Sequence, residues 1–336
     1  MPSDNRQLSA VPTNIITGFL GVGKTSTIRH LLRHRPAGER WAVLVNEFGE
    51  IGIDGSLFTG EHREEQGVFI REVPGGCMCC AAGLPMQVAL NQLLTLARPD
   101  RLLIEPTGLG HPKEVLEVLS SNFYRDVVDL QRILTLVDAR KLSDTRYTEH
   151  DTFNQQLDIA DVIVANKRDL YEAADPARLS AYAEQRGLAS KQVVFTQNGE
   201  IDAALLEGGT MATTVAAHHH HGHDEQRPLV SEVPIPECGY LKAQNAGEGY
   251  ESVGWRFSPS FVFDREKLFA VFTGIVAERM KAVFITHNGV FGYNLTQDAL
   301  SEIELDDCLE SRIEIIADKI NGDWDAQIMA CVSARQ

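Results

Sequence analysis

The sequence predicts an α/β domain with a mostly parallel sheet, followed by a small α+β domain with an antiparallel sheet. Between residues 11 and 196, short apolar and β-branched runs recur, and stretches with helical spacing separate several of them. The periodicity is lost at residues 207–227, where small residues and histidines gather. Beyond that segment, the turn signal His287-Asn288-Gly289 lies between two apolar runs, which is typical of an antiparallel hairpin.

A chain of 336 residues has enough material for two cores. We therefore expect a first domain at 1–206, a His-rich linker at 207–227 and a second domain at 228–336. The second domain is predicted to hold a helix capped by Asp264 and a last helix over 324–332. Its predicted strands are 251–257, 282–286, 290–295, 301–305 and 312–316.

The charge balance is acidic, with 31 Lys and Arg against 47 Asp and Glu and a net charge of -16. Binding to nucleic acid or to an anionic membrane requires a basic surface, so neither is expected as the main partner. The first ten residues lack the apolar segment of a signal peptide, and no run of about 18 apolar residues occurs. We expect a cytoplasmic protein.

The octet GFLGVGKT at residues 18–25 follows a predicted strand at 11–17 and precedes a segment of helical character at 26–33. This context is typical of a phosphate-binding loop, in which backbone N–H groups surround phosphates at a helix N-terminus. We expect Lys24 to reach the β- and γ-phosphates and the Thr25 hydroxyl to hold Mg²⁺. The first domain is thus predicted to be a P-loop NTPase domain. The candidate nucleotide-binding residues of the loop are Gly18, Gly21, Val22, Gly23, Lys24, Thr25 and Ser26.

Acidic residues follow two further predicted strands. Glu47 comes after the strand at 41–45, where ligands bind in open α/β sheets, although a solvated loop carboxylate explains it equally well. Glu105 ends the strand at 101–104 and is the better candidate for Mg²⁺, held directly or through water.

The residues after Glu105 predict a slow enzyme. Gly108 is placed to offer its N–H group to the γ-phosphate. Leu109 stands where Ras-like enzymes carry a glutamine that orients the attacking water. We therefore expect unaided hydrolysis at about 10⁻⁴ to 10⁻² per second.

The segment Asn166-Lys167-Arg168-Asp169 follows a predicted strand at 160–165, about 140 residues after the phosphate loop. In this position it predicts guanine recognition, with the Asp169 carboxylate accepting hydrogen bonds from guanine N1–H and the exocyclic amine. An adenine would leave that carboxylate without its donors, which favours GTP over ATP.

Cys77, Cys79 and Cys80 lie on a loop between a predicted strand at 68–73 and a predicted helix at 84–96. Crowded thiols in a reducing compartment favour a metal site, and helix N-termini favour the thiolate form that binds metal. Two or three cysteine ligands leave a tetrahedral Zn²⁺ shell incomplete, which suits a site that passes its metal on. A redox thiol and plain packing remain alternatives.

Histidines are dense in the predicted linker. Imidazoles at this density bind Zn²⁺, Ni²⁺ or Co²⁺ weakly and reversibly, while a solvated linker is the alternative. The candidate ligands are His218, His219, His220, His221 and His223.

The order of these motifs resembles that of the CobW-like P-loop GTPase family of metal chaperones, which is related to the hydrogenase and urease nickel-chaperone GTPases. The resemblance implies a GTPase that binds Zn²⁺ or a similar transition metal such as Co²⁺ or Ni²⁺. It implies that the protein transfers the metal to a client metalloprotein under control of the bound nucleotide. It also implies that Cys77, Cys79 and Cys80 are metal ligands, with Glu47 as a switch acid near the metal. Lys24, Glu47 and Glu105 are then the catalytic candidates.

Other functions stay open at this point. These are a regulatory GTPase with a structural zinc, a metal-insertion accessory protein for cobalt or iron of the cobalamin or nitrile hydratase type, and a nucleotide-regulated thiol redox protein. The oligomeric state is also open between a monomer and a homo-oligomer that depends on nucleotide or metal.

Overall fold

The protein is described from a computed structural model, which covers residues 10–46, 67–73, 84–110, 112–212, 234–247, 249–305, 308 and 310–335. These residues divide into two compact units. The described part of the first unit ends at residue 212, and that of the second begins at residue 234.

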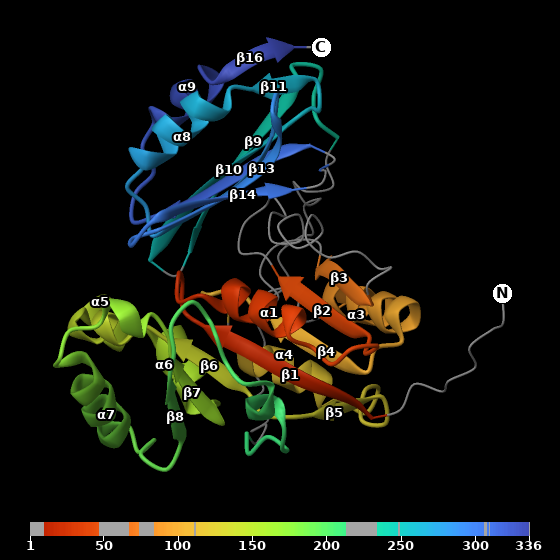
Figure 1. The fold of residues 1–336 in the computed structure, drawn as a ribbon, viewed down its shortest axis with the longest axis vertical. Helices are drawn as coiled ribbons and strands as arrows, with labels where there is room; N and C mark the ends of the chain where they lie inside the picture. Colours follow the sequence, from red (N-terminus) through yellow and green to blue (C-terminus); the bar gives the residue numbers. More distant parts are fainter. Residues whose placement is uncertain are drawn as a thin grey trace. The chain divides into compact units, whose positions relative to one another are not determined.

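The first unit is built on a parallel sheet with the strand order β3-β2-β4-β1-β6-β7-β8, and β5 pairs with β1 (Figure 1). Its strands are β1 (Val11–Gly18), β2 (Trp41–Asn46), β3 (Val68–Val73), β4 (Arg101–Glu105), β5 (Val128–Leu130), β6 (Leu134–Val137), β7 (Val162–Ala165) and β8 (Gln192–Phe195). Every strand pair in it is parallel, as between Ile15 of β1 and Ile104 of β4. The carboxyl ends of the strands therefore meet at one edge, where the connecting loops form the usual ligand site of such sheets.

Helices pack on the faces of this sheet, which is why its strands are nearly continuous apolar runs. They are α1 (Lys24–Arg33), α3 (Leu84–Ala97), α4 (Pro112–Leu119), α5 (Thr145–Thr148), α6 (Asp151–Asp158) and α7 (Asp175–Gln185), with the short 3₁₀ turns η2 (Ala139–Ser143), η3 (Arg168–Leu170) and η4 (Ala203–Leu206). On one face, Leu90 and Leu93 of α3 and Leu116 of α4 share a core with Leu44 and Ile104 of the strands.

The second unit holds a mostly antiparallel sheet with the order β14-β13-β12-β15-β10-β9. Its elements are β9 (Tyr240–Gly247), β10 (Tyr250–Phe257), β11 (Phe261–Phe263), α8 (Arg265–Thr273), β12 (Arg279–Thr286), β13 (Gly289–Thr296), β14 (Leu300–Leu305), β15 (Ser311–Ala317), α9 (Trp324–Met329) and β16 (Val332–Arg335). The short strand β11 pairs in parallel with β12 and antiparallel with β16. Helices α8 and α9 lie beside each other (Figure 1), and Phe272 and Ile328 join them to the aromatic core of the sheet.

The predicted fold class is confirmed, because a parallel sheet with helices precedes a mostly antiparallel α+β unit. The predicted cap is also present, since the Asp264 carboxylate accepts a hydrogen bond from the Lys267 N–H at 3.1 Å. The last helix is a correction. It ends at Met329, and Val332 begins a strand that pairs with β11. An apolar run of this length does not separate helix from strand by its pattern alone.

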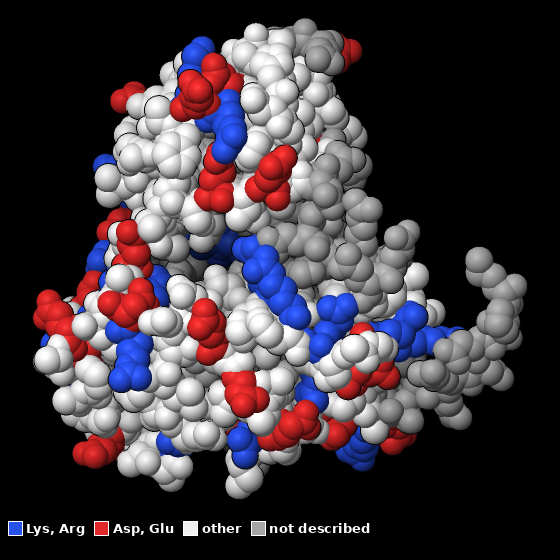
Figure 2. Space-filling model, viewed as in Figure 1, with Lys and Arg blue, Asp and Glu red and all other residues white. Residues whose placement is uncertain are grey.

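Acidic side chains lie among the basic ones on the face of the molecule drawn in Figure 2, in keeping with the net charge of -16. Within the described ranges, no helix has the length and apolar character needed to cross a membrane.

Candidate nucleotide-binding site

The phosphate loop turns sharply between β1 and α1, and glycine is required at both ends of the turn. Gly18 has φ 141° and Gly23 has φ 101°, backbone conformations that other residues rarely adopt. A Cβ atom on Gly23 would also overlap the side-chain amide of Asn166. The first helical residue after Gly23 is Lys24, so the loop leads directly into the N-terminus of α1.

The Lys24 side chain is buried and folds back over the loop. Its Nζ atom donates hydrogen bonds to the carbonyl oxygens of Gly18, at 2.8 Å, and of Phe19, at 3.1 Å. The ammonium group is therefore held inside the curve of the loop, where a phosphate bound by the N–H groups of α1 would lie.

Thr25 and Glu105 meet at the same edge of the sheet. The Thr25 hydroxyl donates to Glu105 Oε1 at 3.0 Å, and the Glu105 side chain is 3% exposed. A hydroxyl and a carboxylate side by side are the hard oxygen donors that Mg²⁺ prefers. The two residues thus fit the magnesium role predicted for them.

Asn166 joins the phosphate loop to the loop that follows β8. Its Nδ2 atom donates to the Val22 carbonyl at 2.9 Å, and its Oδ1 atom accepts from the Gly199 N–H at 3.0 Å. The residue is 2% exposed, so water does not compete for these bonds. Three segments that are distant in sequence are therefore fixed to one another by one amide.

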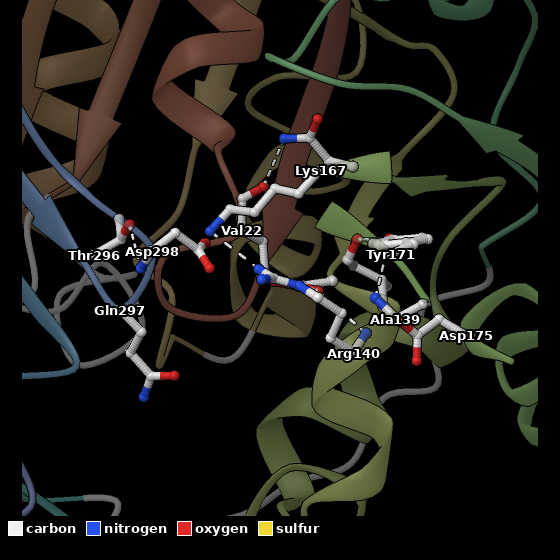
Figure 3. A network of polar contacts seen from close by, with 12 residues as sticks. Val22, Ala139, Arg140, Lys167, Tyr171, Asp175, Thr296, Gln297 and Asp298 are labelled. Atoms are coloured by element: carbon white, nitrogen blue, oxygen red, sulfur yellow. Dashed lines mark hydrogen bonds and ion pairs between the residues drawn. The ribbon is translucent and has the colours of Figure 1, made fainter. Parts of the chain in front are cut away.

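Lys167 follows in the left-handed conformation, with φ 63°, and its Nζ atom lies 4.0 Å from Asp138 Oδ2. Asp138 directly follows β6 and also accepts hydrogen bonds from the Arg140 side chain, at 2.9 and 2.5 Å. Tyr171 lies next to this group (Figure 3), and its hydroxyl accepts from the Ala139 N–H at 3.0 Å. Burial raises the pKa of the Tyr171 phenol, which keeps it neutral.

Asp169 lies on η3 and is exposed. Among the described residues, none donates a hydrogen bond to its carboxylate or forms an ion pair with it. The backbone of the preceding residue is fixed, because the Arg168 N–H donates to the Thr196 carbonyl at 2.9 Å. The carboxylate is thus presented to solvent on a backbone that is tied to the next strand end.

The turn after β4 packs closely on the phosphate loop. A Cβ atom on Gly108 would lie 2.9 Å from the Leu20 nitrogen, so only glycine fits there. Leu109 is buried, and its apolar side chain offers no group that could orient a water molecule. From the other side, Gln156 of α6 donates its Nε2 hydrogen bond to the Gly108 carbonyl at 3.0 Å.

An aromatic cluster supports the phosphate loop from α5 and α6. The buried Phe19 ring meets the rings of Tyr147, His150 and Phe153 edge to face, with centroid distances of 5.0, 4.8 and 6.0 Å. Such contacts add specific geometry to apolar burial. The loop is therefore anchored by a side chain as well as by its backbone.

The structure brings Gly18, Lys24, Thr25, Glu105, Gly108 and Asn166 to one edge of the parallel sheet. Several predicted metal residues lie outside the described residues: Glu47, Cys77, Cys79, Cys80, His218, His219, His220, His221 and His223. In the part of the chain that the structure does describe, no cluster of three or more His, Cys, Asp or Glu is arranged to hold a metal ion.

Sequence reasoning missed two contributors to this edge, Asp138 as the partner of Lys167 and Gln156 as the partner of Gly108. The position of Gln156 in the sequence could have indicated its role. On α6 it shares the buried stripe with Phe153 and Leu157, and a glutamine on an apolar stripe requires a buried hydrogen-bond partner.

The amino-acid sequence is similar to one family model and to several known proteins. The family model for the CobW/HypB/UreG nucleotide-binding domain matches residues 12–195. The zinc chaperone YeiR of Escherichia coli K12 is 40% identical over 329 residues, which cover 96% of this chain and 98% of that protein. The zinc chaperone CobW of a Sinorhizobium species is 30% identical over 247 residues, which cover 66% and 69%.

Among solved structures, the Zn(II)-bound YjiA GTPase from Escherichia coli is similar with a TM-score of 0.42 and 20% identity. The alignment covers 96% of this chain and 99% of that chain.

Proposed function

The chain belongs to the CobW/HypB/UreG family, and from that membership we propose that it is a GTP-hydrolysing metallochaperone. In this proposal it binds Zn²⁺ or a similar transition metal at Cys77, Cys79 and Cys80 and transfers it to a client metalloprotein. The nucleotide state controls retention and release. Family membership confirms the resemblance that the order of motifs predicted.

The observation that carries the nucleotide half of the proposal is the joint position of Lys24, Thr25 and Glu105 at the start of α1. A buried ammonium group, a hydroxyl and a carboxylate lie where the phosphates of a nucleotide would meet the helix N-terminus. The relative that matches almost the whole chain is a zinc chaperone, which supports the metal half.

Each residue has a defined role in the proposed hydrolysis. Lys24 balances the charge of the β- and γ-phosphates, and the Gly108 N–H group binds the γ-phosphate. Thr25 and Glu105 would hold Mg²⁺, which supplies positive charge to the phosphate oxygens when bound. The buried Leu109 offers the attacking water no polar side chain, which supports a slow intrinsic reaction.

Guanine selection is assigned to the segment 166–169. Asn166 fixes the segment to the phosphate loop, and the exposed Asp169 carboxylate accepts from the guanine ring. The contacts of Lys167 with Asp138 keep the segment in place.

Metal and nucleotide must influence each other if the chaperone cycle is correct. In sequence, the three cysteines lie between Glu47 and Glu105, so loops that respond to GTP flank the cargo site. By linkage, a nucleotide that changes metal affinity has its own affinity changed by the same factor, typically 5- to 150-fold.

The test is a competition titration with chromogenic chelators, using Zn²⁺, Co²⁺ and Ni²⁺ in turn. Wild type is expected to bind the metal with affinities that differ at least about fivefold between a non-hydrolysable GTP analogue and GDP. Cys79→Ser should lose tight binding in both states. The matched control is Cys238→Ser, which changes an exposed thiol of the second unit and should leave both affinities unchanged.

Equal metal affinity in the two nucleotide states would contradict the chaperone cycle and favour a regulatory GTPase with a structural zinc. Absence of metal binding together with reversible oxidation of Cys79 would favour a thiol redox protein.

A further inference from the structure

Gln156 connects the turn after β4 to the core of the first unit. Its Nε2 atom donates to the Gly108 carbonyl at 3.0 Å and lies 3.4 Å from the Gly110 carbonyl. The main-chain carbonyl of Gln156 accepts from the Thr135 hydroxyl at 2.7 Å, which fixes the residue to β6. The side chain therefore reaches the turn from a rigid base.

The other end of the same amide is unusual. Gln156 Oε1 is buried and accepts no hydrogen bond from the residues that the structure describes, and the whole residue is 1% exposed. A buried acceptor without a donor destabilises the fold, and native proteins keep few of them. A second arrangement of the turn, in which one of its N–H groups points at Oε1, would satisfy this atom.

Helix α6 also contacts the phosphate loop. His150, which caps the helix, and Phe153 in its first turn both pack on the Phe19 ring. One helix thus touches the loop predicted to bind the phosphates and the turn predicted to sense the γ-phosphate. Because the same helix contacts both, it offers a direct physical connection between them.

We propose that Gln156 is a positioning residue that sets the turn at 107–110 in two alternative arrangements. In the arrangement described here, its NH₂ group holds the carbonyls of Gly108 and Gly110. When the Gly108 N–H turns to a γ-phosphate, the turn rearranges and Oε1 accepts one of its N–H groups. A glutamine is suited to this because its amide carries donors and an acceptor at one end.

This proposal deepens the proposed function and rests on it, because only a nucleotide with a γ-phosphate can separate the two arrangements. It predicts that Gln156 contributes to the preference for GTP over GDP and to the rate of hydrolysis. It also predicts that Gln156 contributes little to the binding of GDP itself.

The test variant is Gln156→Met, which keeps the side-chain length and removes every hydrogen bond of the amide. Affinities for fluorescent GDP and for a fluorescent, non-hydrolysable GTP analogue would be measured on the full chain, with single-turnover GTP hydrolysis in parallel. We expect the ratio of the two affinities to fall about tenfold and the hydrolysis rate to fall by a similar factor. The GDP affinity should change less than about twofold.

The matched control is Gln155→Met, the same substitution on the adjacent, half-buried position of α6. It should leave the affinity ratio and the rate unchanged. If Gln156→Met lowers the melting temperature but keeps the wild-type ratio and rate, Gln156 is only structural and the proposal is wrong. If wild type binds neither guanine nucleotide, the proposed function fails instead.

A measurement on the unmodified protein covers the case in which Gln156→Met does not fold. The side-chain amide signal of Gln156 would be followed by ¹⁵N NMR with GDP and then with the GTP analogue. A shift of this signal, with the Gln155 amide as reference, is expected. An identical Gln156 signal in the two states would overturn the proposal.

Discussion

Both units bury charged and polar side chains, and one group in each unit shows two different uses of them. In the first unit, Lys24, Glu105 and Asn166 lie where parallel strands end and loops begin. In the second unit, Arg256 and Lys281 lie inside the strands β10 and β12. These buried polar residues of the first unit thus lie at the sheet edge where ligands bind, whereas those of the second unit lie on a face of the sheet.

The pairing pattern explains the second case. Arg256 lies opposite Arg312 in the register of β10 and β15, and Glu310 accepts hydrogen bonds from both, at 2.6 and 2.8 Å. Trp255 and Phe257 on either side of Arg256 enter the apolar core, so the charges occupy the opposite face of the sheet. Buried charges that satisfy one another within a sheet serve structure, whereas those grouped at a strand edge are available to a ligand.

The largest effect is expected from Lys24→Ala in the first unit. Loss of the ammonium group removes a charge that stabilises the phosphates in the transition state, so kcat/KM for GTP should fall about 100-fold or more. Steady-state phosphate release would measure it. Arg33→Ala removes an exposed positive charge from the end of the same helix and should leave kcat/KM nearly unchanged. A Lys24→Ala enzyme with wild-type activity would contradict the site.

Arg256→Met is the corresponding change in the second unit. It leaves the carboxylate of Glu310, about one-tenth exposed, with Arg312 as its remaining partner, and should lower the free energy of unfolding by about 1–3 kcal/mol. Urea denaturation would measure this, with GTP hydrolysis as the parallel assay. The rate of hydrolysis by the folded fraction should be unchanged.

The triple variant Arg256→Met with Arg312→Met and Glu310→Gln is the control, because it removes all three charges of the group. It should recover part of the lost stability. If the single variant is as stable as wild type, the ion pair does not have the structural role inferred for it.

Sequence could predict the first unit well because its site is local. The segment from Gly18 to Thr25 carries its own strand, turn and helix signals, and the acids and amides at the strand ends follow from parallel topology. Gln156 could not be placed in the same way. Its partner Gly108 is 48 residues away, and only the packing of α6 on the sheet brings them together.

The second unit contains a strand whose own residues give no signal for it. The sequence does not predict strand β9, because the segment YLKAQNAG has little alternation and no β-branched residue. It forms because the hairpin pairs all eight residues with β10, from Tyr240 opposite Phe257 to Gly247 opposite Tyr250. The secondary structure of such a segment depends on the strand with which it pairs, and the residues of the segment alone do not show that partner.

Asp169→Asn changes an exposed carboxylate that we assign to a ligand, in contrast to the buried carboxylate of Glu310, which we assign to the fold. Asp169 is exposed, so stability should hardly change. The affinity for GTP should fall about tenfold or more, because the amide cannot accept both guanine donors, and the affinity for xanthosine triphosphate should rise. Competition between the two nucleotides would measure it, and retained preference for GTP would count against the guanine assignment.

The smallest effect concerns one tyrosine in each unit. Burial raises the pKa of both Tyr171 and Tyr293 above the usual value of about 10. The unfolded chain therefore loses these protons first, so stability is complete below about pH 10 and falls as the pH rises above it. Tyr171→Phe and Tyr293→Phe should each flatten this alkaline decline in urea titrations, and an unchanged slope would contradict the burial argument.

The two hydrogen bonds of Asn166 have a consequence for the rate at which a nucleotide leaves. Val22 belongs to the phosphate loop and Gly199 to the loop that follows β8, and one side chain holds both. Because opening either loop breaks a hydrogen bond of the same amide, we expect the two loops to open together. A bound nucleotide should thus have a long residence time, and a protein that displaces the loop at Gly199 would act as an exchange factor by loosening both ends at once.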